Sequence, residues 1–308
     1  MMKIFLLILV LLYVAVISYI VFMCLKLITR PIRYSYEDCR STEIENGFAD
    51  SIRKYENDWN REAFELPCNG VKISGEIIRN PKAKENKAVI VCHGQKVNRY
   101  CSIKYADMFM DMGYNVVLYD ERYFGRSTGK ISTLGQEEAK DLKEVYAYTK
   151  KVFKDDCRIG LHGESMGAAT SLLSLQYISP VFVVADCPFS DSYKLYDEFT
   201  IKNVHLPPVL ILPWVALIAK HKYGYDIKNT SPIKAVENSD VPICFMHGTS
   251  DGLIRHEHSE AMLKVCKNKK SEIHLYEGAD HARSVFVDRE RYRKEMEDFV
   301  KKCEKGLC

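Results

Sequence analysis

The hydrophobic pattern divides the chain into two unequal parts. Residues 4–25, IFLLILVLLYVAVISYIVFMCL, form an uncharged and almost wholly apolar run. A helix needs about 20 such residues to cross the hydrocarbon core of a bilayer. The run exceeds the roughly 7–15 apolar residues of a signal peptide, and no A-x-A-like cleavage site follows it. We therefore expect an uncleaved single-pass transmembrane anchor. A buried core helix is the weaker alternative, because no polar face interrupts the run.

Basic residues flank this run unevenly. Lys26, Arg30 and Arg33 follow it, whereas only Lys3 and the amino terminus precede it. Because positive charge favours the cytoplasmic side of a membrane, we expect a cell-membrane protein whose large domain lies in the cytoplasm. The eleven cysteines, an odd number without paired C-x-x-C spacing, agree with a reducing compartment. An outward-facing domain is the alternative.

A polar and charged segment separates the predicted anchor and its basic flank, residues 1–33, from the remainder. We expect residues 34–60 to form a juxtamembrane helix lying against a catalytic domain of residues 61–308. That domain begins with FELPCNGVKISGEI, which alternates around Asn69-Gly70. This dipeptide favours a tight hairpin turn, so the segment predicts two antiparallel strands.

From Ala88 onward, short apolar runs alternate with segments of helical periodicity. The runs AVIVCHG, NVVLYD, CRIGLHG, VFVVAD, PICFMHG and EIHLYEG each end on glycine or aspartate, and EEAKDLKEVYAYTKKVF is typical of the intervening segments. Strands that alternate with helices predict a parallel sheet covered on both faces. With the hairpin, we expect a mostly parallel sheet of eight strands in one α/β domain.

One stretch, at about residues 190–236, breaks this alternation. It contains a second apolar run, LPPVLILPWVALIAK, which is too short to span a bilayer and is interrupted by Pro213. We interpret the stretch as a small helical cap over the strand ends. An ordinary core helix is the alternative.

Composition narrows the function classes. Hydrophobic residues make up 47% of the 308 residues and charged residues 28%, which is usual for a globular protein and argues against disorder. The formal net charge is only +3, and no basic stripe with interleaved aromatic residues occurs. Nucleic acid is therefore not an expected partner.

A serine lies between two glycines in the segment Gly163-Glu164-Ser165-Met166-Gly167. The segment follows a predicted strand and precedes a predicted helix, which is the context of the G-x-S-x-G nucleophile elbow. In such a turn the serine is strained and points out at the strand end, and side chains at the glycine positions would clash. We expect Ser165 to be a nucleophile, with Gly163 and Gly167 permitting the turn.

A serine hydroxyl is a poor nucleophile unless a base accepts its proton. Of the nine histidines, His281 follows the last predicted strand and is free to reach over the sheet, so we expect it to be the base. Asp251, at the end of the preceding strand, would orient the imidazole, and Ser165, Asp251 and His281 occur in the order that this type of site requires. Asp186 is the second choice of acid, and Asp120 is interpreted as a turn residue.

The tetrahedral intermediate of acyl transfer carries an oxyanion that needs two hydrogen-bond donors. The backbone N–H of Met166 is one candidate, because it directly follows the serine. The backbone N–H of Gln95 is the other, in the loop CHGQKVN after the first parallel strand. An ordinary polar loop residue is the alternative interpretation of Gln95.

These motifs resemble the α/β-hydrolase superfamily, in particular bacterial membrane-anchored serine hydrolases of the serine aminopeptidase-like or acylaminoacyl-peptidase-like group. The shared motifs are HGQ, YDERYFGRSTG, TLGQEEAKDL, GESMG, ADCPFSD, SPIKAV, HGTSD and EGADHARS, across about residues 88–303. The resemblance implies the Ser-His-Asp triad named above, with no cofactor and no metal. YDERYFGRS departs from the R-G-x-G of many relatives, and we expect Tyr123 and Phe124 to narrow the cleft.

The sequence thus predicts a serine hydrolase that cleaves carboxylic esters through an acyl-enzyme. The apolar cap around Trp214 and the nearby membrane favour an acyl or lipid-like substrate. A serine peptidase or aminopeptidase-like amide hydrolase is the close alternative. A non-catalytic binding protein of the same fold is less favoured, because such proteins usually lose the serine, the histidine or the elbow glycines.

Overall fold

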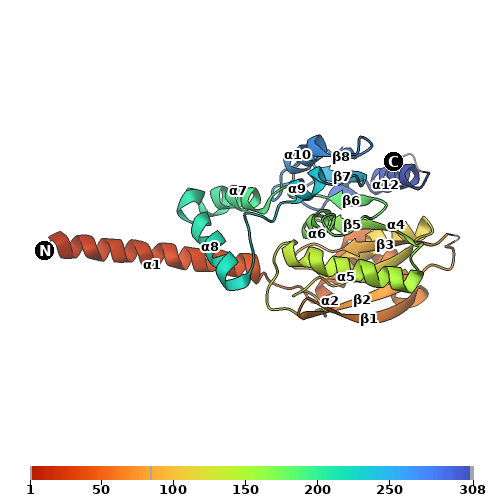
Figure 1. The fold of residues 1–308 in the computed structure, drawn as a ribbon, viewed down its shortest axis with the longest axis horizontal. Coiled ribbons are helices and arrows are strands. Elements are labelled where there is room, and N and C mark those ends of the chain that lie inside the picture. Colours follow the sequence, from red (N-terminus) through yellow and green to blue (C-terminus); the bar gives the residue numbers. More distant parts are fainter. Residues whose placement is uncertain (1, 84, 306–308) are drawn as a thin grey trace.

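Eight strands form one sheet in the computed structural model, which describes residues 2–83 and 85–305 (Figure 1). Their order across the sheet is β1-β2-β4-β3-β5-β6-β7-β8. The strands are β1 Asn60–Cys68, β2 Val71–Arg79, β3 Lys87–Cys92, β4 Asn115–Tyr119, β5 Arg158–Glu164, β6 Val183–Asp186, β7 Ile243–Gly248 and β8 Glu272–Tyr276. Every pair from β4 to β8 is parallel, which confirms the mostly parallel eight-stranded sheet.

The antiparallel edge of the sheet is the expected hairpin. β1 pairs with β2 along its whole length, and β2 pairs antiparallel with β4. The turn residues Asn69 and Gly70 have φ angles of 42° and 79°. Both values are positive, as a tight two-residue hairpin turn requires, and asparagine and glycine tolerate them best.

Helices cover both faces of the sheet, as predicted from the alternation of apolar runs. On one face, α4 Ile103–Asp111, α11 Ser284–Val287 and α12 Arg289–Glu304 share an apolar core with the strands. On the other face, α5 Gln136–Phe153, α6 Met166–Ser174, α9 Pro232–Glu237 and α10 Glu257–Val265 do the same. The strands contribute β-branched and other apolar side chains to both cores, as expected for a sheet buried on both sides.

The segment between α1 and β1 is helical, but it is not the single helix expected for residues 34–60. It consists of α2 Tyr36–Glu43, the π-helical turn η1 Ile44–Phe48, α3 Ala49–Arg53 and the π-helical turn η2 Lys54–Asp58. Gly47 breaks the run with a φ of 86°. Phe48, Ile52 and Tyr55 are buried in the same core as α4 and α12. The segment is therefore part of the packing of the domain.

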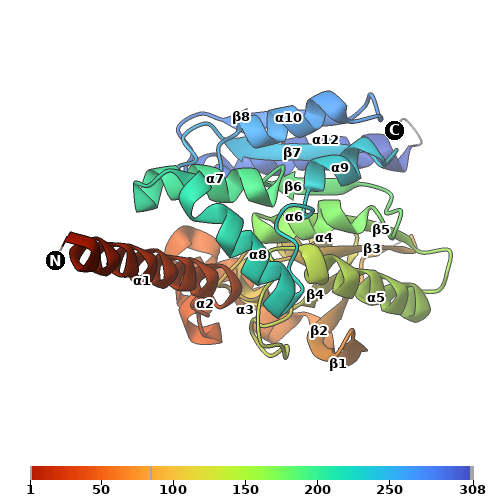
Figure 2. The same ribbon diagram turned by 60° about the vertical axis from the view of Figure 1, so that its left-hand side comes forward.

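The chain leaves the sheet after β6 and returns before β7, and this insertion carries α7 Ser192–Val204, the 3-10 turn η4 Pro208–Leu210 and α8 Leu212–Tyr223. We call these three elements the cap. The N-terminal helix α1, Met2–Thr29, extends away from the domain, and α8 lies beside its C-terminal half (Figures 1 and 2). Val21 and Leu25 of α1 are buried in one apolar cluster with cap residues.

Burial of the helices between α1 and β1 predicts a large contribution of this segment to stability. Ile52 is 1% exposed, and Ile52→Ala should lower the free energy of unfolding by about 2–5 kcal/mol, since it removes core volume. Urea unfolding followed by circular dichroism measures the change. The control is Ile32→Ala, because Ile32 is 73% exposed and its truncation should have little effect. Equal effects of the two variants would show that the segment is not part of the folded core.

Candidate active site

Ser165 occupies a sharp turn between β5 and α6. Its backbone has φ 56° and ψ −115°, a conformation that costs energy for any residue with a side chain. The Ser165 N–H donates to the carbonyl oxygen of Asp186 on the neighbouring strand, at 2.8 Å. The turn thus has the geometry of a nucleophile elbow, which lifts the serine oxygen clear of the strand end.

The two elbow glycines are required by close backbone contact. A Cβ atom on Gly163 would lie 2.2 Å from the carbonyl oxygen of Gly167. A Cβ atom on Gly167 would lie 2.2 Å from the carbonyl oxygen of Cys92, at the end of β3. Neither distance is possible for real atoms, so only glycine lets α6 begin this close to both strands.

The three side chains expected to form a triad meet at the C-terminal ends of the strands. Ser165 Oγ lies 2.8 Å from His281 Nε2, and His281 Nδ1 lies 2.8 Å from Asp251 Oδ2. Asp251 lies in the loop after β7, and His281 lies in the loop after β8. Both distances are those of normal hydrogen bonds. The structure therefore brings together the three residues named from the sequence, whose catalytic roles stay a prediction.

The environment of Asp251 favours its ionised form. Its Oδ1 accepts the backbone N–H groups of Leu253 and Ile254, at 2.9 and 2.7 Å. Burial raises the pKa of Asp251, but hydrogen bonds from His247 and His281 lower it more, and the net pKa lies well below the usual range. The carboxylate is therefore charged at neutral pH and can hold the imidazole by its Nδ1–H group.

His281 is more basic than an ordinary histidine. Burial of the ring lowers its pKa, but the hydrogen bond and the negative charge of Asp251 outweigh this, and the net pKa is raised above 6.5. The side chain is 19% exposed, so its ring reaches the surface above the elbow. A partly exposed, hydrogen-bonded imidazole beside a serine oxygen has the geometry of a general base.

The other acids considered from the sequence lie apart from the imidazole ring. Asp186 is fully buried behind the elbow, where its Oδ2 accepts the hydroxyl of Tyr105 at 3.2 Å. Burial and the charge of Glu164 raise the pKa of Asp186 to about 7. Asp120 accepts the N–H groups of Arg99 and Arg126 and so organises its own turn, as expected.

Two backbone N–H groups beside Ser165 are available to a ligand. In the part of the chain that the structure describes, neither Met166 N–H nor Gln95 N–H donates a hydrogen bond. The loop that carries Gln95 lies against the elbow, because a Cβ on Gly94 would be 3.6 Å from Ser165 Cβ. Their role as oxyanion donors stays a prediction.

A buried ionic cluster under the elbow was not recognised from the sequence. Lys104 Nζ lies 3.1 Å from Glu43 Oε1 and 3.3 Å from Glu164 Oε2, and the Tyr105 hydroxyl donates to Glu164 at 2.7 Å. Burial lowers the pKa of Lys104, but the charges of Glu164 and Glu43 raise it by more, and the net pKa lies above the usual range. The lysine is therefore charged. The sequence offered one sign of this cluster, which is the single lysine, Lys104, in the largely buried helix α4.

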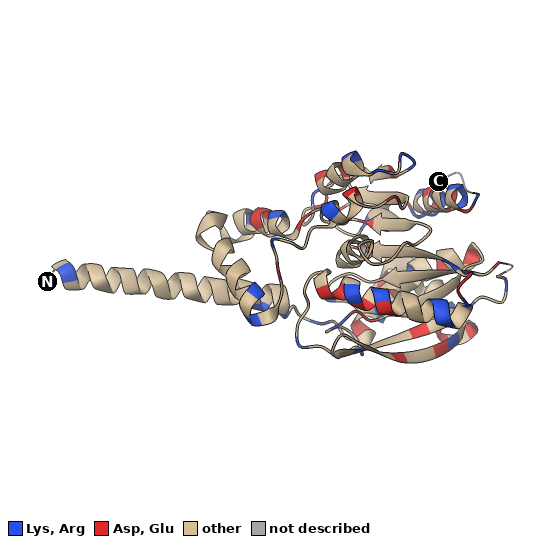
Figure 3. Cartoon of the chain, in the orientation of Figure 1, with Lys and Arg blue, Asp and Glu red and all other residues tan. Residues whose placement is uncertain are grey.

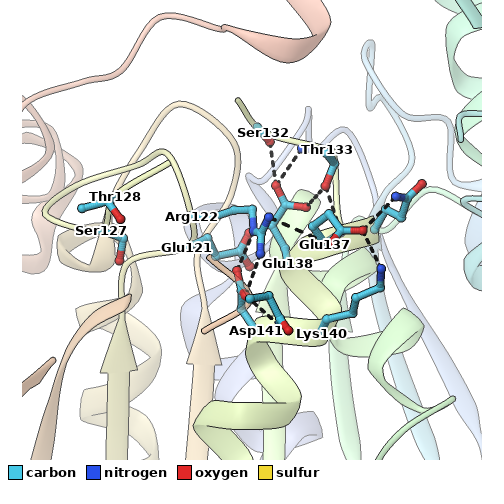
Figure 4. A network of polar contacts seen from close by, with 12 residues as sticks. Glu121, Arg122, Ser127, Thr128, Ser132, Thr133, Glu137, Glu138, Lys140 and Asp141 are labelled. Atoms are coloured by element: carbon cyan, nitrogen blue, oxygen red, sulfur yellow. Dashed lines mark hydrogen bonds and ion pairs between the residues drawn. The ribbon is translucent and has the colours of Figure 1, made fainter. Parts of the chain in front are cut away.

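A second polar network holds the loop beside Met166 (Figure 4). The Glu138 carboxylate accepts the N–H groups of Thr133 and Gly135, at 2.8 and 3.0 Å, and the hydroxyl of Ser132, at 3.0 Å. This side chain therefore caps the start of α5. The Ser132 hydroxyl also lies 3.5 Å from the sulfur of Met166, so the capped loop supports the residue that follows the serine.

The segment that departs from the R-G-x-G pattern contacts the base of α1. The Tyr123 hydroxyl donates to the carbonyl oxygen of Pro31 at 3.0 Å, and the Arg33 guanidinium lies 5.0 Å from the Tyr123 ring centroid. Phe124 is fully buried, with its ring edge-on to His93. That these two rings narrow the cleft stays a prediction.

Among the described residues, two groups of side chains have donor atoms close enough to share a metal ion. The first is Cys187 with Asp251 and His281, and the second is Cys244 with Glu272 and His274. In the first group, Asp251 and His281 already pair with each other. In the second, Glu272 contacts both His274 and Lys302. The carboxylates of both groups are thus satisfied by protein partners.

Comparison with known proteins identifies the family. Residues 102–306 match the model of the prolyl oligopeptidase family. The chain is 32% identical over 273 residues to the uncharacterized protein YqkD of Bacillus subtilis, covering 86% of each chain. The Pyrococcus furiosus esterase Pf2001 has a similar fold, with a TM-score of 0.66 and 24% identity over 81% of this chain and 93% of that one. An acylaminoacyl peptidase of Pyrococcus horikoshii has a TM-score of 0.62 and 17% identity, over 83% of this chain and 43% of that one. This chain therefore belongs to the prolyl oligopeptidase family and is an α/β-hydrolase.

Proposed function

We propose that this protein is a membrane-anchored serine hydrolase that cleaves carboxylic esters of acyl or lipid-like substrates. The observation that carries the proposal is the continuous chain of hydrogen bonds from Ser165 through His281 to Asp251. The match to a hydrolase family supports hydrolysis as the reaction type. No metal is required by this chemistry, because the chain itself supplies nucleophile, base and acid.

The geometry supports an acyl-enzyme mechanism. Ser165 Oγ attacks the carbonyl carbon of the ester while His281 Nε2 accepts the hydroxyl proton, giving a tetrahedral intermediate with an oxyanion. Collapse of that intermediate breaks the ester bond, and His281 gives the proton to the departing alkoxide. A water molecule, deprotonated by His281, then attacks the acyl-enzyme and releases the acid and free Ser165. Asp251 stabilises the imidazolium that forms twice in this cycle.

The oxyanion would be held by the N–H groups of Met166 and Gln95. Both N–H groups lie beside Ser165 without a protein acceptor among the described residues. Donors placed in advance cost no reorganisation when charge develops on the oxygen, and each contributes about 10²–10³ in rate. Because both are backbone groups, their position depends on the elbow and on the capped loop beside it.

Apolar surface on the cap supports a lipid-like ester. The cap exposes large hydrophobic side chains, and these are Phe199, Ile201, Val209, Leu210, Trp214 and Leu217. Exposed apolar patches of this kind mark ligand, protein or membrane contact sites. The family description and the acylaminoacyl peptidase of similar fold favour a second candidate, an amide hydrolase that cleaves peptides. The two candidates differ in substrate and not in the catalytic residues.

Membrane attachment through α1 belongs to the same proposal. α1 is long and apolar enough to cross a bilayer by length and composition, a test that a signal sequence also passes. Lys26, Arg30 and Arg33 follow the apolar run, which supports a single-pass protein with a cytoplasmic domain.

Covalent labelling tests the nucleophile. The wild-type protein should react with a fluorophosphonate probe and hydrolyse aryl esters of increasing acyl length, whereas Ser165→Ala should do neither. Ser250→Ala is the matched control, because Ser250 is an exposed serine near the site that is outside the hydrogen-bonded chain. Equal labelling of wild type and Ser165→Ala would remove Ser165 from the mechanism. If the protein hydrolysed aminoacyl amides and no esters, the proposed esterase function would be wrong and the peptidase function would take its place.

The pH profile tests the base and its acid partner. Because His281 must be neutral to accept a proton and its pKa is raised, kcat/KM should fall as pH drops through a value above 6.5. Asp251→Asn should lower kcat on the order of 10⁴-fold and move this limb to lower pH. Asp186→Asn should lower kcat far less, because Asp186 contacts Tyr105 and not the imidazole. If Asp186→Asn lowered kcat as much as Asp251→Asn does, Asp251 could not be assigned as the acid partner of His281 on this ground.

A further inference from the structure

A large groove lies between α1 and the cap, away from the three residues of the candidate triad. One wall is residues 13–30, which belong to α1 and the residue directly after it, and the other is the cap from Val209 to Tyr223. Its volume is about 760 Å³, within the range of roughly 300–1,000 Å³ that is usual for small-molecule sites. We call it the α1–cap groove.

Most of the α1–cap groove is apolar. α1 and α8 contact each other through an apolar cluster that includes Val21 and Leu25. The outer part of the α1–cap groove stays open. Phe22, Leu210 and Trp214 line the open part and remain 60%, 39% and 55% exposed. Such a surface is unfavourable in water, so we expect apolar matter to cover it.

One end of the α1–cap groove carries three cations. Lys26 lies in the last turn of α1, Arg30 directly follows that helix, and Lys222 lies in the last turn of α8. Figure 3 shows Lys and Arg residues where α8 ends. Within the described residues, none of the three pairs with a carboxylate. By contrast, Lys220 on the same helix pairs with Asp226 at 2.7 Å. The α1–cap groove is therefore apolar along most of its length and carries unpaired positive charges at one end.

The α1–cap groove is long enough to cross the hydrocarbon part of one leaflet of a bilayer. At 1.5 Å per residue, Tyr13 lies about 20 Å from Lys26 along α1. The hydrocarbon core of a bilayer is about 30 Å thick, so half of it is about 15 Å. If α1 spans the membrane, the cations lie at the interface on the side of the domain and the apolar end reaches the middle of the bilayer.

We propose that the α1–cap groove binds one anionic phospholipid of the leaflet that adjoins the domain. An acyl chain lies between α1 and α8 along Phe22 and Trp214, and the phosphate lies at Lys26, Arg30 and Lys222. The complementary charge favours an anionic over a zwitterionic lipid, because Lys and Arg hold phosphate oxygens by charge-assisted hydrogen bonds. This inference rests on the membrane attachment in the proposed function, but it does not need Ser165 to react.

Tryptophan fluorescence can detect this lipid. The chain has two tryptophans, so Trp59→Phe leaves Trp214, in the groove wall, as the sole reporter. The full chain carrying Trp59→Phe and Ser165→Ala is placed in nanodiscs of phosphatidylcholine and phosphatidylglycerol, with acyl-chain bromines on one lipid at a time. At equal mole fraction, brominated phosphatidylglycerol should quench Trp214 more than brominated phosphatidylcholine. The Ser165→Ala background separates this result from hydrolysis, so either proposal can fail alone.

A charge variant with a matched control distinguishes a site from general attraction to the membrane. A Lys or Arg near an anionic membrane surface contributes about 1 kcal/mol, which corresponds to about a fivefold change in binding. Lys222→Gln should therefore lower the preference for phosphatidylglycerol about fivefold. Lys220→Gln makes the same change two residues away, outside the groove lining, and should lower it much less. Equal losses in the two variants, equal quenching by the two lipids, or no quenching of Trp214 would each overturn the proposal.

Discussion

The close backbone contact at the elbow is the constraint on which the candidate site depends. α6 begins in contact with β3 and β5 only because Gly163 and Gly167 carry no side chain. That contact holds Ser165 at a φ of 56° and aims its oxygen beyond the strand ends. The loop that carries Gln95 packs against the same elbow, since a Cβ on Gly94 would be 3.6 Å from Ser165 Cβ. One arrangement of the main chain thus positions the proposed nucleophile and both proposed donors.

An acidic side chain beneath the elbow is paired with a lysine of α4, outside the sheet. Glu164 and Asp186 lie under Ser165. Burial lowers the pKa of His281, the hydrogen bond and charge of Asp251 raise it, and Glu164 and Asp186 raise it further. Lys104 forms an ion pair with Glu164 and a second ion pair with Glu43 of α2. Breaking a buried ion pair by removing one partner costs several kcal/mol, because the remaining charge is left without compensation. The helices between α1 and β1 therefore contribute to the electrostatics of the site as well as to the core.

The sequence predicted those features that follow from local pattern. Asn69-Gly70 predicts its hairpin because the turn needs two positive φ angles, and Ser165, Asp251 and His281 follow apolar runs whose ends meet at one sheet edge. The Lys104 cluster could not be predicted in this way, because its partners lie 61 and about 60 residues away in sequence and are joined by packing alone. The contact of α8 with α1 depends likewise on tertiary structure. The break at Gly47 does have a local signal, because Asn46-Gly47 is the same dipeptide as in the hairpin turn and Gly47 has a φ of 86°.

The base of α1 is joined to the candidate site by a short series of contacts. The carbonyl oxygen of Thr29, in the last turn of α1, accepts the N–H of Ser132 at 2.9 Å, and the Ser132 hydroxyl touches the sulfur of Met166. Tyr123 holds the chain just beyond α1 through Pro31. These contacts join the domain to the base of α1, and the cap packs against the same helix. With α1 in a bilayer, as we propose, the apolar cap would lie in the adjoining leaflet, where a lipid-like ester is concentrated. The same contacts that join the domain to α1 would then bring its site to the substrate.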